Sequence, residues 1–596
     1  PQSNPLREGG RDGHTIDPIM IERVEVIHGA NAIHGLGAAG GIINLITKKP
    51  TQETVHSLRI GIEAQDADVS ESLGYNASYT LSGSVDRFDA IASFGYRETG
   101  VGYDANDEVI GFDNTQGDTM DSASYDAFLK LGYNLDQQRI EFTYNHYRIE
   151  NHNDWLGVNG NLAAGIPTTA IKADVPGDAP QNEVTTISLN YLHEALFGHQ
   201  LRLQLFSQDF AGTYGGGTFG TFQDPAFGAN VFDQSENQSQ KYGMKLTLSK
   251  DRVFDLPVNA VYGVDVVEDK TQQELIQTGR AWVPETVYKN YAPFLQLEYV
   301  GIEKLTVSAG VRQEESELEV EDFTTLYSYN GGQAVTGGTP SFSETLVNMG
   351  ATYQLTEPLR IYANYSESFS MPDVGRVLRG IDIPGQSVEQ FLDLKPILTE
   401  NYEIGLELNL DSLRGQITYF TSESDLGQRL QPDADGIFSV QREKTEIDGI
   451  ELRADWLLGA KDTLGLRYAY LRGEFDSDQD GKTDTDLSGV NISPNRLNLS
   501  WEHNWAATVS TRLQANYLFD RKFKDASGAT YEAFNGYTTF DLYANWMTPV
   551  GNFSLGINNL ADKDYFSYHS QAGGGSNSRN FKGLGRSAQL SYDIQF

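Results

Sequence analysis

Apolar and polar residues alternate with a period of two along much of the chain. The last seven residues are a clear example, with Leu590, Tyr592, Ile594 and Phe596 separated by single polar residues. Successive side chains of an extended strand point to opposite faces, so this pattern predicts a strand with one apolar and one polar face.

Segments of this kind, counted from residue 54, number 22. They begin near residues 54, 72, 86, 121, 137, 184, 198, 240, 257, 288, 303, 343, 358, 399, 413, 444, 460, 494, 507, 536, 551 and 584. Short turns alternate with long connections such as 150–183 and 370–398. An even strand number and this alternation of loop lengths are typical of transmembrane β-barrels. The pattern therefore predicts an all-β fold in which residues 54–596 form a 22-stranded antiparallel barrel.

Composition narrows the class of protein further. The 596 residues include 44 Lys and Arg against 82 Asp and Glu, which gives a net charge of −38, and there is no Cys. A nucleic-acid binder needs a basic surface, and thiolate metal sites and disulfide scaffolds need Cys. No apolar run is long enough for a membrane helix, which needs roughly 18 to 20 residues. The soluble alternative, a β-helix or propeller, would show a repeat of 20 to 50 residues, and none is evident.

Residues 1–53 do not follow the barrel pattern. Glycines crowd residues 29–41, and the apolar pieces Val24–Ile27 and Ile42–Ile46 flank them, which predicts a small β unit with a glycine-rich turn. A 22-stranded barrel has a lumen too wide for side chains alone to fill, and such barrels are plugged. We therefore expect residues 1–53 to be the C-terminal part of a plug domain. Because no export signal precedes it, we also expect the first part of the plug to be missing from this sequence.

Two segments of this N-terminal unit, Ile21–Ala30 and Ile33–Pro50, resemble the plug signature of TonB-dependent outer-membrane receptors. Within them, His28 and His34 depart from the residues common in the family. Motifs near the C-terminus and in two barrel strands agree as well, namely Asn558–Tyr565, Gly585-Arg586, Phe596, Tyr402–Gly405 and Gly449–Glu451. The resemblance implies a receptor in the outer membrane of a Gram-negative bacterium. It also implies a TonB partner, acting through a TonB box that lies outside this sequence.

Four further segments resemble receptors for citrate-based siderophores of the aerobactin and rhizobactin kind. They are Ile16–Pro18, Tyr242–Leu248, Met371–Gly375 and Gly536–Leu542. This resemblance implies binding and import of a ferric siderophore. Other cargoes of the same receptor class stay open: vibrioferrin or another hydroxamate siderophore, haem, cobalamin or a sugar.

A ferric siderophore of this type is anionic, and its own oxygens fill the coordination sphere of the iron. Recognition therefore requires cationic donors and aromatic side chains above the plug. The candidates in the loops are Arg376, Arg379, Trp155 and Arg521, with Lys522 and Lys524 beside it. Arg11 is a candidate because the resemblance implies an arginine at the plug apex. The competing interpretation is that these are solvated loop charges paired with nearby acids, and that Trp155 is a rim aromatic.

The resemblance also implies an ion cluster between plug and barrel, made by Arg23 with Glu403 and Glu451. The alternation supports it, because Tyr402 and Ile404 share the lipid face and so place Glu403 in the lumen. Buried charges need such pairing. We therefore predict that Arg23→Ala loosens the plug without unfolding the barrel.

The acidic segment 476–484 resembles the start of a calcium loop. Its candidate ligands are Asp476, Asp478, Asp480 and Asp484, with Gly481 at the sixth position. Leu487 stands where a bidentate Glu is expected, so a solvated acidic loop is the alternative. His14 and His34 fit a polar seam between plug and barrel, and His152 fits a solvated loop.

Other functional classes fit less well. A passive channel would not carry a glycine-rich plug, and the chain has neither Gly-x-Ser-x-Gly nor His-Glu-x-x-His, so we expect no enzyme. Apart from the candidate calcium, we expect no cofactor. The expected partners are a ferric siderophore, TonB and outer-membrane lipid or lipopolysaccharide, with no nucleic acid, and the expected state is a monomer.

Overall fold

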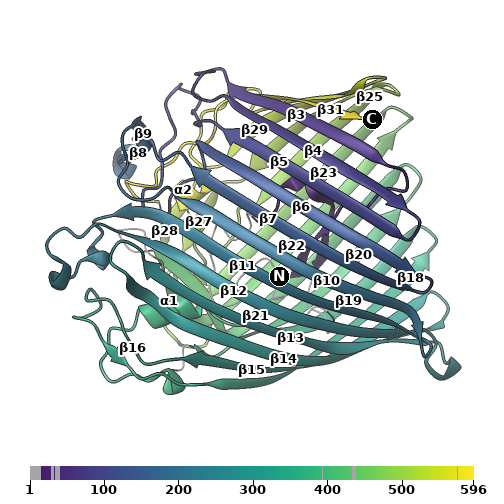
Figure 1. The fold of residues 1–596 in the computed structure, drawn as a ribbon, viewed down its shortest axis with the longest axis horizontal. Coiled ribbons are helices and arrows are strands. Elements are labelled where there is room, and N and C mark those ends of the chain that lie inside the picture. The colour runs from purple at the N-terminus through teal and green to yellow at the C-terminus, as the bar shows by residue number, and fades with distance from the viewer. Residues whose placement is uncertain (1–14, 29–32, 34–40, 392–393, 433–437, 573–574) are drawn as a thin grey trace.

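The computed structural model describes residues 15–28, 33, 41–391, 394–432, 438–572 and 575–596. In this part of the chain, 22 strands form one closed antiparallel barrel (Figure 1). The two-residue strand β24 pairs with the end of β23. The prediction of a 22-stranded barrel is therefore confirmed.

The barrel strands follow one another around the ring in chain order. They are β3 (Val55–Gln65), β4 (Gly74–Val85), β5 (Phe88–Thr99), β6 (Ser122–Leu135), β7 (Gln138–Asn151), β10 (Gln181–Leu196), β11 (His199–Gly217), β12 (Asp233–Lys250), β13 (Val258–Leu275), β14 (Arg280–Ile302), β15 (Leu305–Val320), β18 (Ser341–Thr356), β19 (Leu359–Ser370), β20 (Ile397–Asn409), β21 (Leu413–Pro432), β22 (Phe438–Leu458), β23 (Asp462–Phe475), β25 (Arg496–Ala506), β26 (Val509–Leu518), β29 (Tyr537–Thr548), β30 (Gly551–Asn558) and β31 (Ser587–Gln595). Pairing between β3 and β31 closes the ring.

The long connections at one end of the barrel carry short elements of their own. These are the strands β8 (Trp155–Val158), β9 (Thr169–Lys172), β16 (Phe323–Thr324), β17 (Ala334–Val335), β24 (Thr485–Asp486), β27 (Arg521–Lys524) and β28 (Thr530–Phe534), the helices α1 (Val374–Arg379) and α2 (Tyr568–Ala572), and the 3-10 turns η2 (Leu162–Ala164), η3 (Gly220–Phe222), η4 (Pro225–Phe227) and η6 (Val388–Gln390). A further 3-10 turn, η5 (Val253–Asp255), lies in the connection between β12 and β13. None of the helices in the described ranges is long and apolar enough to cross a membrane.

The outer wall of the barrel is apolar and ends in a row of aromatic rings. Ile60 and Ile62 on β3 are 47% and 54% exposed, as the alternation predicts for a lipid-facing surface. At the end with the short turns, Phe553 lies between Trp546 and Tyr592, with ring centroids 5.8 and 4.8 Å apart. Such a row is typical of the membrane–water interface.

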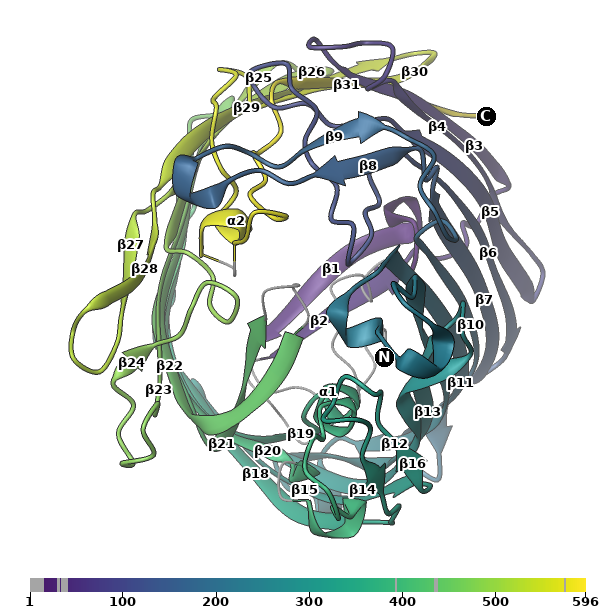
Figure 2. The ribbon, with the colours of Figure 1, turned by 90° about the vertical axis from the view of Figure 1, so that its left-hand side faces the viewer.

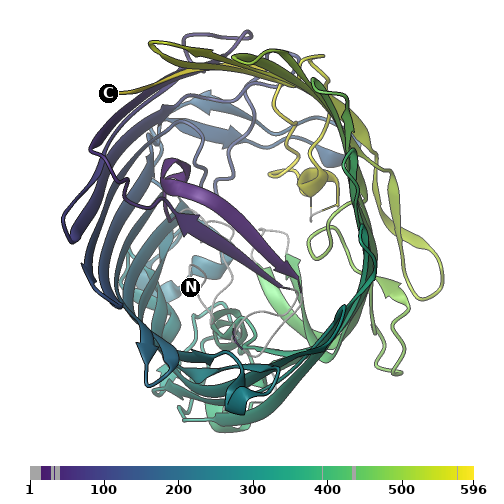
Figure 3. The ribbon, with the colours of Figure 1, turned by 90° about the vertical axis from the view of Figure 1, so that its right-hand side faces the viewer.

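The N-terminal unit lies inside the ring of strands (Figures 2 and 3). It consists of the 3-10 turn η1 (Pro18–Met20), whose N-cap is Asp17, and the strands β1 (Ile21–His28) and β2 (Gly41–Thr47). The two strands form an antiparallel sheet of their own, separate from the barrel sheet. The lumen therefore contains a folded unit, which agrees with the plug expected from residues 1–53.

A small apolar cluster holds this unit against β5 and β6. Met20 is completely buried there with Ile91 and Phe128, and Ile16 and Ile19 pack around them. Burial of apolar surface from water stabilises the contact.

Polar contacts to β6 and β7 add to this cluster. The Lys130 ammonium donates to the Thr47 Oγ1 at 2.7 Å and to the Lys48 carbonyl at 3.1 Å. The Asp17 N–H donates to the Asp126 Oδ2 at 3.3 Å. On β7, the side-chain amide of Asn145 donates to the carbonyl of Thr15 at 2.9 Å. These wall residues are buried, so the contacts are shielded from water. These described contacts attach the N-terminal unit to the sector β5 to β7 of the wall.

Candidate functional site

A pocket of about 470 Å³ opens among the long loops at the mouth of the barrel. Three connections contribute to it: the one between β5 and β6, the one between β7 and β10, and the one between β11 and β12. Its aromatic lining is Phe112, Trp155, Phe219 and Phe232. Aromatic walls with a few polar groups are typical of small-molecule sites, so this is the leading candidate for a ligand site.

Trp155, a predicted ligand residue, lines this pocket. It stacks on Phe112 with centroids 6.5 Å apart and an interplanar angle of 6°. The Lys172 Nζ lies 5.5 Å from its ring centroid, within the range of a cation–π contact. Lys172 also binds Glu71, and this hydrogen bond raises the pKa of Lys172. Trp155 therefore has a fixed orientation beside a positive charge, and its contact with a ligand stays a prediction.

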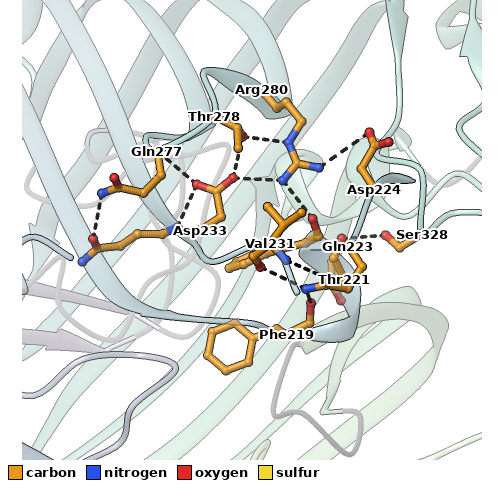
Figure 4. A network of polar contacts seen from close by, with 12 residues as sticks. Phe219, Thr221, Gln223, Asp224, Val231, Asp233, Gln277, Thr278, Arg280 and Ser328 are labelled. Atoms are coloured by element: carbon orange, nitrogen blue, oxygen red, sulfur yellow. Dashed lines mark hydrogen bonds and ion pairs between the residues drawn. The ribbon is translucent and has the colours of Figure 1, made fainter. Parts of the chain in front are cut away.

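A network of polar contacts holds the loop between β11 and β12 in place (Figure 4). Its centre is the buried carboxylate of Asp233, which accepts hydrogen bonds from the Arg280 Nη2 at 2.9 Å and from the Gln277 N–H at 3.1 Å. Arg280 also donates to the Phe222 carbonyl at 2.9 Å and stacks on Phe227 at 4.8 Å. Charge-assisted bonds of this kind are stronger than neutral ones, so the tip of β13–β14 fixes this loop.

Gln234 extends the fixed wall of the pocket to a second loop. Its side-chain amide donates to the Tyr214 carbonyl at 2.9 Å and to the Asp178 carbonyl at 2.6 Å, and it accepts from the Asp178 N–H at 2.8 Å. Glycine is required close by: a Cβ at Gly216 would lie 2.5 Å from the ring of Phe232. Sequence reasoning missed these residues, although the run of three glycines at 215–217 was a visible signal of close packing.

The predicted ligand residues Arg376 and Arg379 lie on the short helix α1. Arg376 forms an ion pair with Asp373, the N-cap of the helix. Arg379 is only 4% exposed: its guanidinium lies 4.0 Å from the ring centroid of Trp282 and donates to the Gln273 Oε1 at 3.0 Å. In this structure both arginines fix the helix to its surroundings, and ligand binding by them stays a prediction.

Arg521 occupies another part of the rim, on β27. Its guanidinium lies 4.9 Å from the ring of Phe523 and donates to the Ser493 carbonyl at 3.4 Å. Figure 2 shows β8, α1 and β27 at different positions around the mouth, so the structure does not bring Trp155, the α1 arginines and Arg521 together. Lys522 and Lys524 lie on the same short strand as Arg521. The predictions for Arg11, His14 and His34 fall outside the described residues.

The ion cluster expected for Arg23 with Glu403 and Glu451 stays a prediction, and the described contacts of Arg23 are with its own strand. Among the described residues, Arg23 pairs with Glu25 at 2.7 Å and with Glu22 at 3.8 Å. Glu25 lies two residues further along β1, on the same face of the strand, and so is within reach of the guanidinium. Arg23 is 52% exposed, and Glu403 lines the wall of the lumen without contacting it.

The acidic loop brings three of its four predicted calcium ligands together. Carboxylate oxygens of Asp476, Asp478 and Asp480 lie within 4.8 Å of one another, whereas Asp484 is not in the group. The Lys482 ammonium binds Asp480 at 2.8 Å, and this hydrogen bond lowers the pKa of Asp480. A lysine therefore already supplies positive charge to this loop, and calcium binding stays a prediction.

His152 is exposed in its loop, as expected from the sequence, and it has a defined partner. Its Nε2 lies 2.5 Å from the Glu98 Oε1. Nearby, burial and a hydrogen bond to Asp154 raise the pKa of Asp121 to about 7.

Comparison with known proteins adds sequence relatives of nearly full length. A ferric aerobactin receptor of Klebsiella pneumoniae is 27% identical over 651 residues, covering 100% of this chain and 85% of the relative. A rhizobactin receptor of Rhizobium meliloti (strain 1021) is 25% identical, covering 94% of this chain and 79% of the relative.

Solved structures share the fold at lower sequence identity. The copper transporter OprC superposes with a TM-score of 0.75 at 15% identity, covering 98% of this chain and 86% of that one. The ferric-catecholate import receptor Fiu from K12 E. coli gives 0.70 at 17% identity, covering 97% and 87%. The family model described as TonB dependent receptor-like, beta-barrel, matches residues 65–560. With most of its length matched, the chain belongs to the TonB-dependent receptors, β-barrel proteins of the Gram-negative outer membrane.

Proposed function

We propose that this receptor binds a ferric siderophore of the citrate-based type at its outer mouth and imports it. The observation that carries the proposal is similarity along the whole chain to receptors named for aerobactin and rhizobactin. The mouth pocket supports it, because its aromatic walls and its 470 Å³ volume suit an organic ligand of moderate size. The iron stays in the siderophore, so no protein ligand to iron is needed.

Within this proposal, Trp155 packs against the ligand and the neighbouring Lys172 supplies positive charge. Arg376, Arg379 and Arg521 would have to leave their present partners to reach a ligand in the same pocket. Exchange of one charged partner for another is feasible at the rim for Arg521, whose bond to Ser493 is long at 3.4 Å. It is harder for Arg379, which is buried against Trp282.

We also propose that residues 1–53 act as plug and residues 54–596 as barrel, with TonB as the source of energy. The separate sheet of β1 and β2 supports this boundary. We infer a monomer whose apolar outer wall contacts lipid and lipopolysaccharide.

Equilibrium titration of the purified receptor with ferric aerobactin, ferric vibrioferrin, haem and cobalamin tests the cargo. We expect one of the two ferric siderophores to bind at least tenfold more tightly than haem or cobalamin. Trp155→Ala should weaken that binding about tenfold, or about 1.4 kcal/mol. Trp505→Ala, at the end of β25 with the short turns, is the matched control and should leave binding unchanged. Tighter binding of haem or cobalamin would contradict the proposed cargo.

A further inference from the structure

The long connection between β30 and β31 contacts two of the connections that form the mouth pocket. It runs from residue 559 to 586 and contains α2. A β-bridge between Phe566 and Lys582 closes its base. None of its described residues belongs to the lining of the pocket. We call residues 577–580 of this connection the clasp, because they bind the loops on which the pocket is built.

Arg579 in the clasp is a buried guanidinium, with only 2% of the residue exposed. Its Nε lies 2.8 Å from the Asp113 Oδ2. Asp113 belongs to the connection between β5 and β6 and lines the mouth pocket. Its other carboxylate oxygen accepts hydrogen bonds from the N–H groups of Thr115 and Gln116, both at 3.0 Å. One carboxylate therefore joins Arg579 to the turn 113–117.

The turn 113–117 fixes the aromatic wall of the pocket. Asn114 donates through Nδ2 to the Gly157 carbonyl at 3.0 Å and accepts through Oδ1 from the Gly157 N–H at 2.9 Å. Gly157 lies two residues after Trp155 on β8, and Phe112, which precedes the turn, stacks on Trp155. A Cβ at Gly157 would lie 2.2 Å from the Phe112 carbonyl oxygen, so the turn and β8 are in close contact. A displacement of the turn therefore displaces Phe112 and Trp155 as well.

The clasp also binds the hairpin of β8 and β9 directly. The Asn577 carbonyl accepts a hydrogen bond from the Gly160 N–H at 2.7 Å. Asn580 accepts through its carbonyl from the Thr168 N–H at 2.9 Å and donates through its own N–H to the Thr168 Oγ1 at 3.0 Å. Figure 2 shows β8, β9 and α2 on the same side of the mouth. The hairpin that carries Trp155 is thus held by the clasp at both ends of its connecting loop.

The ion pair of Arg579 and Asp113 is shielded from water, with the two side chains 2% and 16% exposed. Burial and, to a smaller extent, the charge of Arg579 lower the pKa of His569 on α2. This histidine is therefore neutral near pH 7, and it adds no second positive charge beside Asp113. Removal of one member of a buried ion pair leaves the other charge without compensation, which is costly. Neutralising Arg579 therefore favours rearrangement of the turn.

We propose that Arg579 is a positioning residue for the mouth pocket. It holds the turn 113–117, and through this turn Phe112 and Trp155, in the arrangement that receives the ligand, and it does not itself contact the ligand. This inference rests on the proposed function. It adds a determinant of affinity that comes from a loop whose described residues lie outside the pocket lining.

Titration of purified Arg579→Gln with ferric aerobactin tests this role, because a titration separates affinity from the fraction of receptor that binds. A displaced wall weakens binding in every molecule, so we expect Kd to rise by roughly fivefold or more at an unchanged number of ligands bound per receptor. A role limited to folding would lower the number of ligands bound and leave Kd unchanged. That outcome would overturn the proposal.

A conservative substitution and a matched control accompany this variant. Arg579→Lys keeps a positive charge near Asp113 and should restore part of the affinity, although an ammonium lacks the planar fork of a guanidinium. Arg586→Gln is the control, because Arg586 lies in the same connection and pairs with Asp66. It should change Kd less than twofold. If Arg586→Gln weakens binding as much as Arg579→Gln does, the effect does not come from the clasp.

Electron paramagnetic resonance gives a readout that needs no ligand. The chain has no Cys, so a nitroxide attached at Gln116→Cys is the only label. Gln116 lies in the turn and outside the pocket lining. Adding Arg579→Gln should raise the mobile component of the spectrum at least twofold, whereas adding Arg586→Gln should leave the spectrum as it was. A spectrum that does not respond to Arg579→Gln contradicts the positioning role.

The two proposals fail in distinguishable ways. If the unmodified receptor does not bind ferric aerobactin while it binds haem or cobalamin, the proposed cargo is wrong, and the variants are titrated with the ligand that binds. If Arg579→Gln binds ferric aerobactin as tightly as the unmodified receptor, the cargo stands and the positioning role is wrong. If Arg579→Gln does not fold, Asp113→Asn, which removes the same ion pair from its other side, replaces it in both measurements.

Discussion

Two sides of the barrel wall differ in their described contacts with the N-terminal unit. On β5 to β7, buried contacts to Met20, Asp17 and Thr47 hold it in place. On β20, Glu403 faces the lumen, and among the described residues Arg23 pairs with glutamates of its own strand. A glutamate that faces the lumen need not pair with the nearest arginine of the N-terminal unit. Which ion pair forms depends also on how far the arginine can reach and on whether a closer carboxylate competes for it.

This asymmetry has a mechanical meaning. A unit with one firmly held sector can swing or unfold while that sector keeps hold of it. The described buried contacts place a firm sector at β5 to β7. Three substitutions test how unequal the two sides are, and all three use hydrogen exchange of residues 15–28 and 41–47 as the measurement.

Met20→Ala should have the largest effect. Met20 is 0% exposed, so truncation removes apolar contact and leaves a cavity beside Ile91 and Phe128. Such truncations cost about 3 kcal/mol, which would raise exchange in the N-terminal unit by roughly two orders of magnitude. Met349→Ala is the control, because Met349 is 57% exposed on the lipid side. If hydrogen exchange of these residues is unchanged in Met20→Ala, the apolar cluster does not anchor the N-terminal unit.

Lys130→Met should have an intermediate effect. It deletes the hydrogen bonds to Thr47 and to the Lys48 carbonyl but keeps the length of the side chain. A loss of about 2 kcal/mol, seen mainly at residues 41–47, is expected for removing bonds to a buried charged group. Arg360→Met, on β19, should leave these residues as protected as in the unmodified receptor. An equal effect of both variants would mean that the two sides hold the unit alike.

Arg23→Ala should have the smallest effect on exchange, because ion pairs between exposed side chains contribute little to stability. The sequence resemblance implied the opposite, a substitution that loosens the plug. If Arg23→Ala matches Lys130→Met in its exchange, the ion cluster with Glu403 and Glu451 operates after all, and the structural interpretation is wrong.

The barrel was largely predictable because period-two alternation is a local signal. Most strands begin within three residues of the predicted positions. The exceptions are β12, β14 and β22, which begin at 233, 280 and 438 and not near 240, 288 and 444. The first eight residues of β12 are all polar, so they carry no alternation although they continue the ladder above the membrane.

The mouth was less predictable, because its contacts join loops far apart in the chain. Trp155 could be nominated as an aromatic residue in a loop, but its neighbour Phe112 comes from a different connection. A charge in a loop can equally bind a ligand or anchor the loop, and sequence does not separate the two. Arg379 was predicted to contact a ligand, and in this structure it packs on Trp282, so its role in binding stays a prediction.

The seam between β3 and β31 has a consequence for biogenesis. Arg59 and Asp593, which meet there, are 534 positions apart, and His56 and Phe596 exchange backbone hydrogen bonds beside them. The cylinder cannot shut until the last strand has been made, so both rims of the unfinished sheet stay unpaired throughout synthesis. Until the final strand arrives, those rims are therefore open to pairing with other chains.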